Sequence, residues 1–245
     1  VRFTRFYSAS PVCSPTRASI MTGRHPARLG ITNWIGGSQH GMLLQADYGR
    51  YLSPDETTLG EAFASAGYAT GYIGKWHLGA DDRFMPARQG FAWTSAVNRA
   101  GQPGSYFPPY RNPDWPITDV PGLEGDPPDA YLTERLTDRA LGFIRSHQDA
   151  PFLLVLSHYA VHTPIPAPVA AVAEYRHNVE ALPPPDGPPS EPESGRATTK
   201  LRQDHPGYAA MVAAVDASLS RIETTLESLG LAEHTVVVFV SDNGA

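Results

Sequence analysis

The stretch TTLGEAFASAGYATGYIGKWHLG, residues 57–79, decides the fold. Apolar side chains recur at helical spacing in residues 57–66 and a glycine follows, so this half is expected to form a short amphipathic helix. Residues 68–73 combine glycine, aromatic and β-branched side chains in the manner of a strand. The polar side chains of Lys75 and His77 come next. A helix, a strand and a polar cluster in this order are typical of α/β proteins, which bind ligands at the carboxyl ends of their strands.

Two wholly apolar runs, residues 152–156 and 236–240, have the composition of strands covered on both faces. Polar side chains follow both runs: His158 and His162 follow the first, and Asp242 and Asn243 the second. Because the carboxyl ends of parallel strands share one edge of a sheet, we expect these groups and the first cluster to converge on one site. His158 is interpreted as a supporting partner of that site.

Apolar stripes at helical spacing predict two longer helices, over residues 131–147 and 208–229, the second of which ends at a glycine. The short helix within residues 57–66 is expected to be capped by Thr57 or Asp55. No internal repeat is visible, and one catalytic domain over residues 1–245 is expected.

The remaining long segments read as loops. Residues 101–128 contain eight prolines and no periodicity, and residues 183–192, PPPDGPPSEP, indicate a stiff, exposed loop.

The net charge of −6 argues against a general nucleic-acid surface. No run approaches the roughly 18 apolar residues of a membrane span, so none is expected. The chain does not begin with Met, and it is expected to begin inside a longer protein.

Cys13 is the only cysteine, which excludes an internal disulfide and a Cys-rich zinc site and leaves a buried apolar thiol or a reactive group. Ser14 is the expected cap of a helix with Pro15 in its first turn and Gly23 at its end. Cys13 would then lie at the positive end of the helix dipole. Arg17, on the first turn, is interpreted either as reaching back toward residue 13 or a bound anion, or as a surface cation.

Lys75 and His77 would project from the same face of an extended segment, and a cation beside an imidazole suits binding an oxyanion and moving a proton. The alternative is a solvated lysine and a histidine that stabilises a turn, and a structural role is equally open for His162. Asp242 and Asn243 offer hard oxygen ligands suited to calcium or magnesium. They also fit a simple Asp-Asn-Gly turn, and two ligands are too few for a calcium site.

Four blocks of the chain resemble the sulfatase family, in the family's order. The blocks are CSPTR (13–17) with TGR (22–24), GYIGKWHLG (71–79), HTP (162–164) and VSDNG (240–244). The long helix over residues 208–229 is similar to the helix before the family's Asp-Asn pair, so the resemblance spans essentially the whole chain. It implies an alkaline-phosphatase-like α/β/α sandwich with a central, mostly parallel sheet.

The resemblance also implies a reaction and its residues. A sulfate monoester, aryl or carbohydrate, would be hydrolysed by the hydrate of Cα-formylglycine, which a formylglycine-generating or anaerobic maturation enzyme makes from the cysteine. By this resemblance, Cys13 would be the precursor of the nucleophile and Arg17 would hold the hydrate. Lys75 and His162 would bind sulfate oxygens, and His77 would help to deprotonate the hydrate. Cys13, Asp242 and Asn243 would hold Ca²⁺ or Mg²⁺.

Two family features lie outside this chain: the Asp-Asp metal motif upstream of the cysteine and a lysine after the Asp-Asn-Gly. The chain is therefore expected to be an internal fragment that alone binds calcium poorly and turns over little substrate.

Two alternatives to a sulfatase remain open: a formylglycine-dependent phosphate or phosphonate hydrolase, and a non-catalytic homologue with unmodified Cys13. Residues 31–37 are expected to line the pocket, and residues 101–128 and 164–200 to shape substrate choice. The family resemblance suggests a periplasmic, secreted or lysosomal location.

Overall fold

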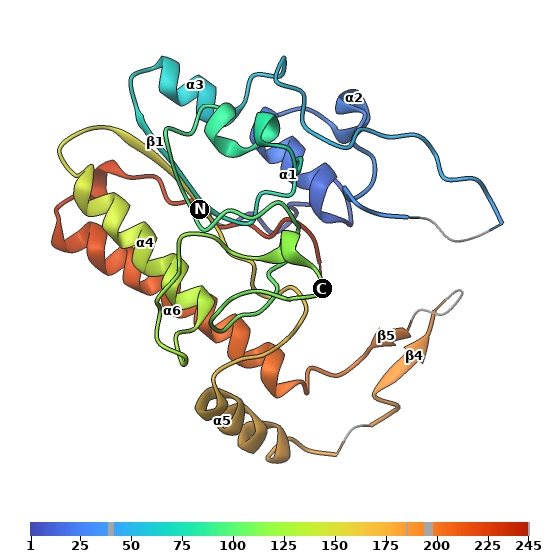
Figure 1. Ribbon diagram of the computed structural model, residues 1–245. Helices are drawn as coiled ribbons and strands as arrows, with labels where there is room; N and C mark the ends of the chain where they lie inside the picture. The colour runs from blue at the N-terminus through green and yellow to red at the C-terminus, as the bar shows by residue number, and fades with distance from the viewer. Residues whose placement is uncertain (39–41, 185, 194–197, 245) are drawn as a thin grey trace.

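The computed structural model describes residues 1–38, 42–184, 186–193 and 198–244 (Figure 1). Its centre is a parallel sheet in the order β2-β1-β3, formed by β1 (Ala69–Gly74), β2 (Trp93–Ser95) and β3 (Phe152–Ser157). The middle strand pairs with both neighbours, so that Tyr72 lies between Thr94 and Val155. The strands predicted over residues 68–73 and 152–156 are thus confirmed to within one residue at each end.

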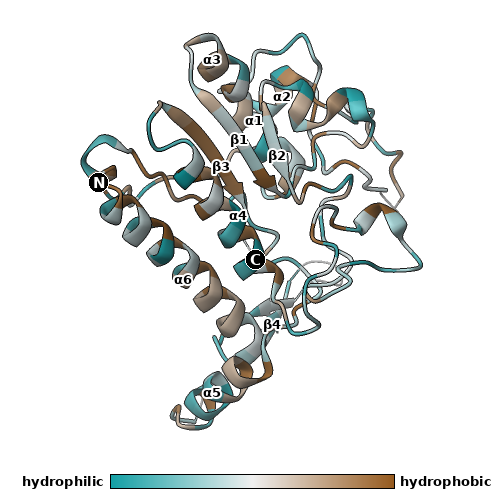
Figure 2. Ribbon diagram, turned by 60° about the vertical axis from the view of Figure 1, so that its left-hand side comes forward, coloured by the Kyte–Doolittle hydropathy of each residue, from teal (hydrophilic) through white to brown (hydrophobic). Residues whose placement is uncertain are grey.

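Helices cover both faces of this sheet, because successive side chains of β1 point to opposite sides. Tyr72 packs in a buried cluster with Ala18 of α1 (Cys13–Thr22). Its neighbour Ile73 packs in a second cluster with Leu136 of α4 (Leu132–Ser146). In Figure 2, the apolar strands β1 and β3 lie between α1 and α3 on one side and α4 on the other, with α6 outside α4. The arrangement is the expected three-layer α/β/α sandwich.

The two long helices form as predicted. The patterns over residues 131–147 and 208–229 correspond to α4 and to α6 (Pro206–Ser228). Where the two helices pack, the Thr137 hydroxyl donates a hydrogen bond to Ser218 Oγ at 2.7 Å, which satisfies two buried polar groups.

Both predicted caps of the shorter helices are wrong. In α1 the N-cap is Val12, and Ser14 lies inside the first turn, where its hydroxyl accepts the Ile35 N–H at 2.9 Å. In α3 (Leu59–Ser65) the cap is Thr58, whose Oγ1 accepts the Glu61 N–H while the Glu61 carboxylate accepts the Thr58 N–H. This reciprocal capping box satisfies two free N–H groups at once, which Thr57 and Asp55 do not achieve.

The predicted strand at residues 236–240 is also wrong. These residues pair with no strand within the described part of the chain, and their side chains are between 44% and 88% exposed. An apolar run becomes a strand only where a neighbouring strand supplies ladder hydrogen bonds. The loop predicted over residues 183–192 is a strand at its C-terminal end, where β4 (Ser190–Pro192) pairs antiparallel with β5 (Thr198–Lys200).

The predicted irregular segment 101–128 contains one short 3-10 helix, η3 (Pro116–Thr118), and buries Tyr106 and Tyr110 against the α4 side of the core. The other described elements are α2 (Pro26–Leu29), α5 (Val169–Glu180) and the 3-10 helices η1 (Asp82–Phe84), η2 (Pro86–Arg88) and η4 (Ala232–His234).

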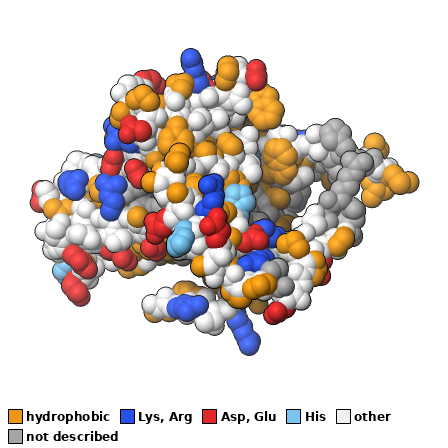
Figure 3. Space-filling view, turned by 90° about the horizontal axis from the view of Figure 1, so that it is seen from below, with side chains coloured by type: hydrophobic (Ala, Val, Ile, Leu, Met, Phe, Trp, Pro, Cys, Tyr) orange, Lys and Arg blue, Asp and Glu red, His pale blue; other side chains and the backbone are white. Residues whose placement is uncertain are grey.

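On the face shown in Figure 3, acidic and basic side chains are interspersed with apolar ones. Among the described residues on that face no continuous basic track is seen, in keeping with the net charge of −6. In the part of the chain that the structure describes, no helix has both the length and the apolar character needed to cross a bilayer.

Candidate active site

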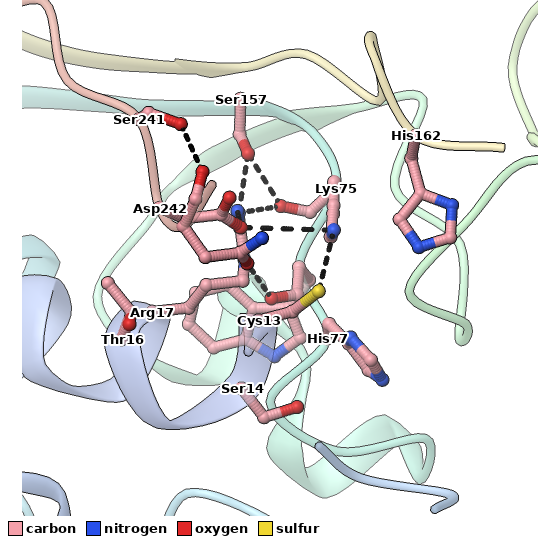
Figure 4. A network of polar contacts seen from close by, with 12 residues as sticks. Cys13, Ser14, Thr16, Arg17, Lys75, His77, Ser157, His162, Ser241 and Asp242 are labelled. Atoms are coloured by element: carbon pink, nitrogen blue, oxygen red, sulfur yellow. Dashed lines mark hydrogen bonds and ion pairs between the residues drawn. The ribbon is translucent and has the colours of Figure 1, made fainter. Parts of the chain in front are cut away.

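Most of the polar groups singled out in the sequence meet at one edge of the sheet (Figure 4). Cys13 is the first residue of α1, and Lys75 and His77 follow β1. His162 lies in the segment after β3, and Asp242 comes from the C-terminal segment. The predicted convergence at the carboxyl ends of the strands is what the structure shows for Lys75, His77 and His162, and Cys13 and Asp242 join them from a helix N-terminus and from a segment that is not a strand.

The thiol of Cys13 lies in an electropositive setting. Lys75 Nζ donates a hydrogen bond to Sγ at 3.2 Å, and Cys13 is also at the N-terminus of α1. Burial raises the pKa of the Cys13 thiol, but the side chains of His162, His77 and Lys75 outweigh burial and lower this pKa to about 5. The surroundings of residue 13 thus stabilise negative charge, as a site for an anion requires.

Arg17 is buried beneath this cluster, and protein groups surround its guanidinium. Nε donates to the Trp76 carbonyl at 2.8 Å, and Nη1 donates to Asp242 Oδ2 at 3.0 Å. Nη2 donates to the Tyr72 hydroxyl at 2.9 Å and also contacts Ser157 Oγ and the Lys75 carbonyl. Burial lowers the pKa of Arg17, but Tyr72 and Asp242 outweigh burial and raise it. The interpretation as a surface cation is wrong, since these contacts make Arg17 a buried cross-link under residue 13.

Tyr72 and Ser157 belong to this network and were not singled out in the sequence. Both hydroxyls donate to the Lys75 carbonyl, at 2.6 and 2.8 Å. Lys75 N–H in turn donates to the Ser157 carbonyl at 2.8 Å, an approach that requires Gly74, because a Cβ there would lie 2.1 Å from that oxygen. The end of β1 is therefore held to the end of β3, which fixes the backbone of Lys75.

Asp242 lies beside two cations, Arg17 Nη1 at 3.0 Å and Lys75 Nζ at 3.8 Å. Burial raises the pKa of the Asp242 carboxyl, but the charges of Arg17 and Lys75 hold it below its ordinary value. Burial, followed by the charge of Arg17, lowers the pKa of Lys75. The three groups form one coupled, partly desolvated charge cluster.

The fit of a divalent metal rests on Asp242 and Asn243. Asn243 Oδ1 is buried and has no hydrogen-bond partner among the described residues, so it is free to coordinate a cation. Together with the Asp242 carboxylate it offers hard oxygen donors, but calcium takes about six to eight. Among the described residues no cluster of three or more His, Cys, Asp or Glu side chains is present. The chain thus fits part of a calcium coordination sphere.

The hydrogen bonds of His77 define its tautomer. Nε2 lies 2.8 Å from the Ile35 carbonyl oxygen, which only accepts, so Nε2 carries the proton. Nδ1 is buried, and among the described residues no side-chain or backbone group is bonded to it. The backbone of His77 has φ of 58°, a left-handed conformation that residues with a Cβ seldom adopt. The Ile35 carbonyl therefore holds the imidazole of His77 beside Cys13.

The second histidine of the site, His162, is held through its other ring nitrogen. Its Nδ1 lies 2.9 Å from the Thr163 carbonyl oxygen, so Nδ1 carries a proton, and Nε2 needs a second proton to donate to an anion at residue 13. The Tyr106 hydroxyl donates to the His162 carbonyl at 2.8 Å and anchors this turn to the core. Figure 4 shows its imidazole on the far side of Lys75 from Arg17.

His158 does not support the site, contrary to the prediction. Successive residues at the end of β3 point to opposite faces, so Ser157 reaches Arg17 while His158 points toward α6. There, His158 Nε2 lies 3.0 Å from Ser218 Oγ. Burial lowers the pKa of His158 from 6.5 to about 4.

This buried histidine predicts a loss of stability in acid. Between pH 6.5 and 4 the unfolded chain binds a proton at His158 that the folded chain does not. The free energy of unfolding should therefore fall as the pH drops through this range, by up to about 3 kcal/mol from this group. Urea unfolding of the full-length protein at several pH values should show the decrease. His158→Gln, which cannot titrate, should flatten it, and an unchanged slope would contradict the assignment.

Comparison with known proteins identifies the family. The sequence matches the sulfatase family profile over residues 1–245. It is 31% identical over 260 residues to N-acetylgalactosamine-6-sulfatase of Mus musculus, covering 99% of this chain and 43% of that protein. It is 32% identical over 251 residues to the ulvan-active sulfatase of Formosa agariphila, covering 100% of this chain and 43% of that protein. It is 29% identical over 269 residues to the arylsulfatase of Hemicentrotus pulcherrimus, covering 100% of this chain and 40% of that protein. The chain belongs to the sulfatase family.

Solved structures give the same result for the fold. The crystal structure of yidJ from Bacteroides fragilis matches with a TM-score of 0.68 and 26% identity, over 98% of this chain and 53% of that one. The phosphonate monoester hydrolase of Agrobacterium radiobacter matches with a TM-score of 0.54 and 16% identity, over 94% of this chain and 53% of that one. The fold is thus alkaline-phosphatase-like, as expected. The chain spans about two fifths of the length of the curated relatives it matches.

Proposed function

We propose that the full-length protein hydrolyses sulfate monoesters at residue 13. The observation that carries this proposal is the arrangement of Lys75, His77 and His162 around Cys13 Sγ, at the N-terminus of α1. These groups lower the pKa of the thiol to about 5, so they favour a negatively charged group at this position. Membership of the sulfatase family supports a sulfate ester as the substrate class.

Residue 13 is a cysteine in this chain, and its sulfur stands where an oxygen of formylglycine hydrate would lie. When the residue is converted, the hydrate would supply one hydroxyl to attack the sulfur of the ester, with loss of the alcohol, and a second to expel sulfate as the aldehyde re-forms. Water would then restore the hydrate, so that the ester and one water give an alcohol and sulfate. A formylglycine-generating or anaerobic maturation enzyme is the partner required.

The side chains of this chain divide the remaining tasks. Nδ1 of His77, when it carries no proton, would accept a proton from a hydroxyl at residue 13, while Nε2 stays bonded to the Ile35 carbonyl. Lys75, and His162 when both of its ring nitrogens are protonated, would bind sulfate oxygens and balance the charge on the leaving oxygen. The hydrogen bonds of Arg17 go to Trp76, Asp242, Tyr72, Lys75 and Ser157. Arg17 would therefore favour the ionised hydrate through its positive charge and would hold it only indirectly. Asp242 and Asn243 would hold part of the shell of Ca²⁺ or Mg²⁺, which supplies further positive charge when bound.

Two measurements on the full-length protein, produced with the maturation enzyme, test this function. Mass spectrometry of the peptide that contains Cys13 should show the aldehyde. A sulfate ester should be hydrolysed faster than the phosphate ester of the same alcohol. An intact cysteine would support the non-catalytic alternative, and faster phosphate hydrolysis would support a phosphate or phosphonate hydrolase, whose fold this chain shares.

Gly101 provides a test of the role of His77. A Cβ at position 101 would lie 2.1 Å from His77 Nδ1, so Gly101→Ala should displace the imidazole. We expect kcat for a sulfate ester to fall about 100-fold, the effect of a displacement of about 1 Å. Steady-state kinetics and thermal unfolding of the full-length protein would measure the effect.

Gly142→Ala is the matched control for this substitution. Gly142 lies within α4, and a Cβ there would meet no atom within 4 Å. This change should leave kcat unaltered and stabilise the helix by about 0.5–1 kcal/mol. Normal kcat in a folded Gly101→Ala variant would contradict the placement of His77 as the base.

A further inference from the structure

We propose that Trp34 forms a sugar-binding wall of the active site, which takes the ring of a sulfated pyranoside while its sulfate group lies at residue 13. The inference rests on the proposed sulfatase function and narrows its substrate class from aryl or carbohydrate sulfates to sulfated saccharides. Residues 31–37 were expected to line the pocket, and Trp34 is the large aromatic residue among them.

The position of Trp34 is coupled to the reaction centre. Its ring centroid lies 6.3 Å from that of His77, with 53° between the ring planes. The next residue, Ile35, is bound on both sides, because its N–H donates to Ser14 Oγ at 2.9 Å and its carbonyl accepts from His77 Nε2 at 2.8 Å. The hydrogen bonds that orient the proposed base therefore also hold the backbone next to Trp34.

The indole is exposed on one side and supported on the other. A Cβ at Gly36 or Gly37 would lie 3.4 or 2.9 Å from atoms of the ring, so the ring rests on bare backbone. The side chain of Trp34 nevertheless remains 43% exposed. A supported aromatic surface open to solvent beside polar groups has the composition of a ligand-binding site, because covering it releases water from apolar area.

Polar groups close to this surface favour a saccharide over a bare aryl group. The Tyr48 hydroxyl donates to the Trp34 carbonyl at 2.8 Å. Arg50 donates to the Gly37 carbonyl at 3.2 Å and to the Tyr48 hydroxyl at 2.7 Å, with its guanidinium 4.0 Å from the centre of the Tyr48 ring. The Arg50 cation is able to bind hydroxyl or anionic substituents of a sugar, and the Trp34 indole is able to pack against the apolar C–H face of the sugar ring.

The test compares Trp34→Ala with Trp34→Phe in the full-length, matured protein. The probes are the 6-sulfates of galactose, N-acetylgalactosamine and N-acetylglucosamine, with 4-nitrophenyl sulfate and ethyl sulfate as esters without a sugar. Inorganic sulfate, used as an inhibitor, reports on the anion site alone. For the sugar sulfate that the wild type turns over fastest, Trp34→Ala should raise KM about tenfold and change kcat less than threefold, the scale of losing one stacking partner.

The inhibition constant of inorganic sulfate and the KM of ethyl sulfate should change less than twofold, and Trp34→Phe should restore most of the KM for the sugar sulfate. An unaltered KM for the sugar sulfate would overturn the inference, as would an equal loss of inorganic sulfate binding. A larger effect on 4-nitrophenyl sulfate would overturn it in favour of an aryl substrate. A wild-type protein that hydrolyses no sulfate ester would instead refute the proposed function.

Discussion

Cys13→Ala is expected to abolish sulfate-ester hydrolysis by the full-length protein, with a fall in kcat of at least about 10⁴-fold. The substitution removes the only atom at this position from which a nucleophile can be made, while Lys75, His77 and His162 remain able to bind the substrate. Wild-type affinity for inorganic sulfate should therefore persist within a few fold. The measurements are single-turnover kinetics and sulfate inhibition or binding.

Cys13→Ser separates two explanations of that loss. A serine hydroxyl is able to attack sulfur but has no second hydroxyl to expel the sulfate, so the variant should release at most one equivalent of alcohol and stay sulfated. Mass spectrometry would detect the sulfated peptide. Multiple turnovers by Cys13→Ala would refute the assignment of the nucleophile, whatever the result with serine.

Arg17→Met is expected to cause the largest loss of stability among single substitutions in the site. Methionine occupies a similar volume but leaves Asp242 without its nearest cation, and it leaves the Tyr72 and Ser157 hydroxyls without a donor. Removing one partner of a buried ion pair costs about 3–5 kcal/mol, because the remaining charge is still desolvated. Urea unfolding of the full-length protein would measure the difference in unfolding free energy.

Arg83→Met is the matched control, because Arg83 also contacts a carboxylate, Asp81, at 2.9 Å but its side chain is 75% exposed. Exposed ion pairs are screened by water, so this variant should keep the melting temperature of the wild type. Equal effects of the two substitutions would show that the contacts of Arg17 contribute no more than those of a surface arginine.

Regular patterns in the sequence predicted the scaffold well. The strands β1 and β3 and the helices α4 and α6 follow from apolar spacing, which depends on neighbours only a few residues away. The convergence of Lys75 and His77 with His162 follows from the shared edge of the parallel strands β1 and β3. These predictions needed no knowledge of which side chains touch.

Features that depend on distant contacts were missed. Ser157 and His158 are adjacent and both polar, and only the packing of β3 between its neighbours decides that Ser157 faces Arg17. The apolar run at residues 236–240 reads as a strand, but a strand also requires a partner alongside, which no local pattern reveals. Tyr72 lies within a predicted strand, and only the fold shows that its hydroxyl accepts a hydrogen bond from Arg17.

The contacts of Arg17 have a consequence for the order of folding. This one side chain joins α1 to the ends of β1 and β3 and to Asp242, a contact between residues 225 positions apart in the sequence. Closing so large a loop costs entropy that is recovered only when the intervening elements are already packed. We therefore expect the charge cluster to be among the last parts to form, so that a partly folded chain has helices and strands but no assembled anion site.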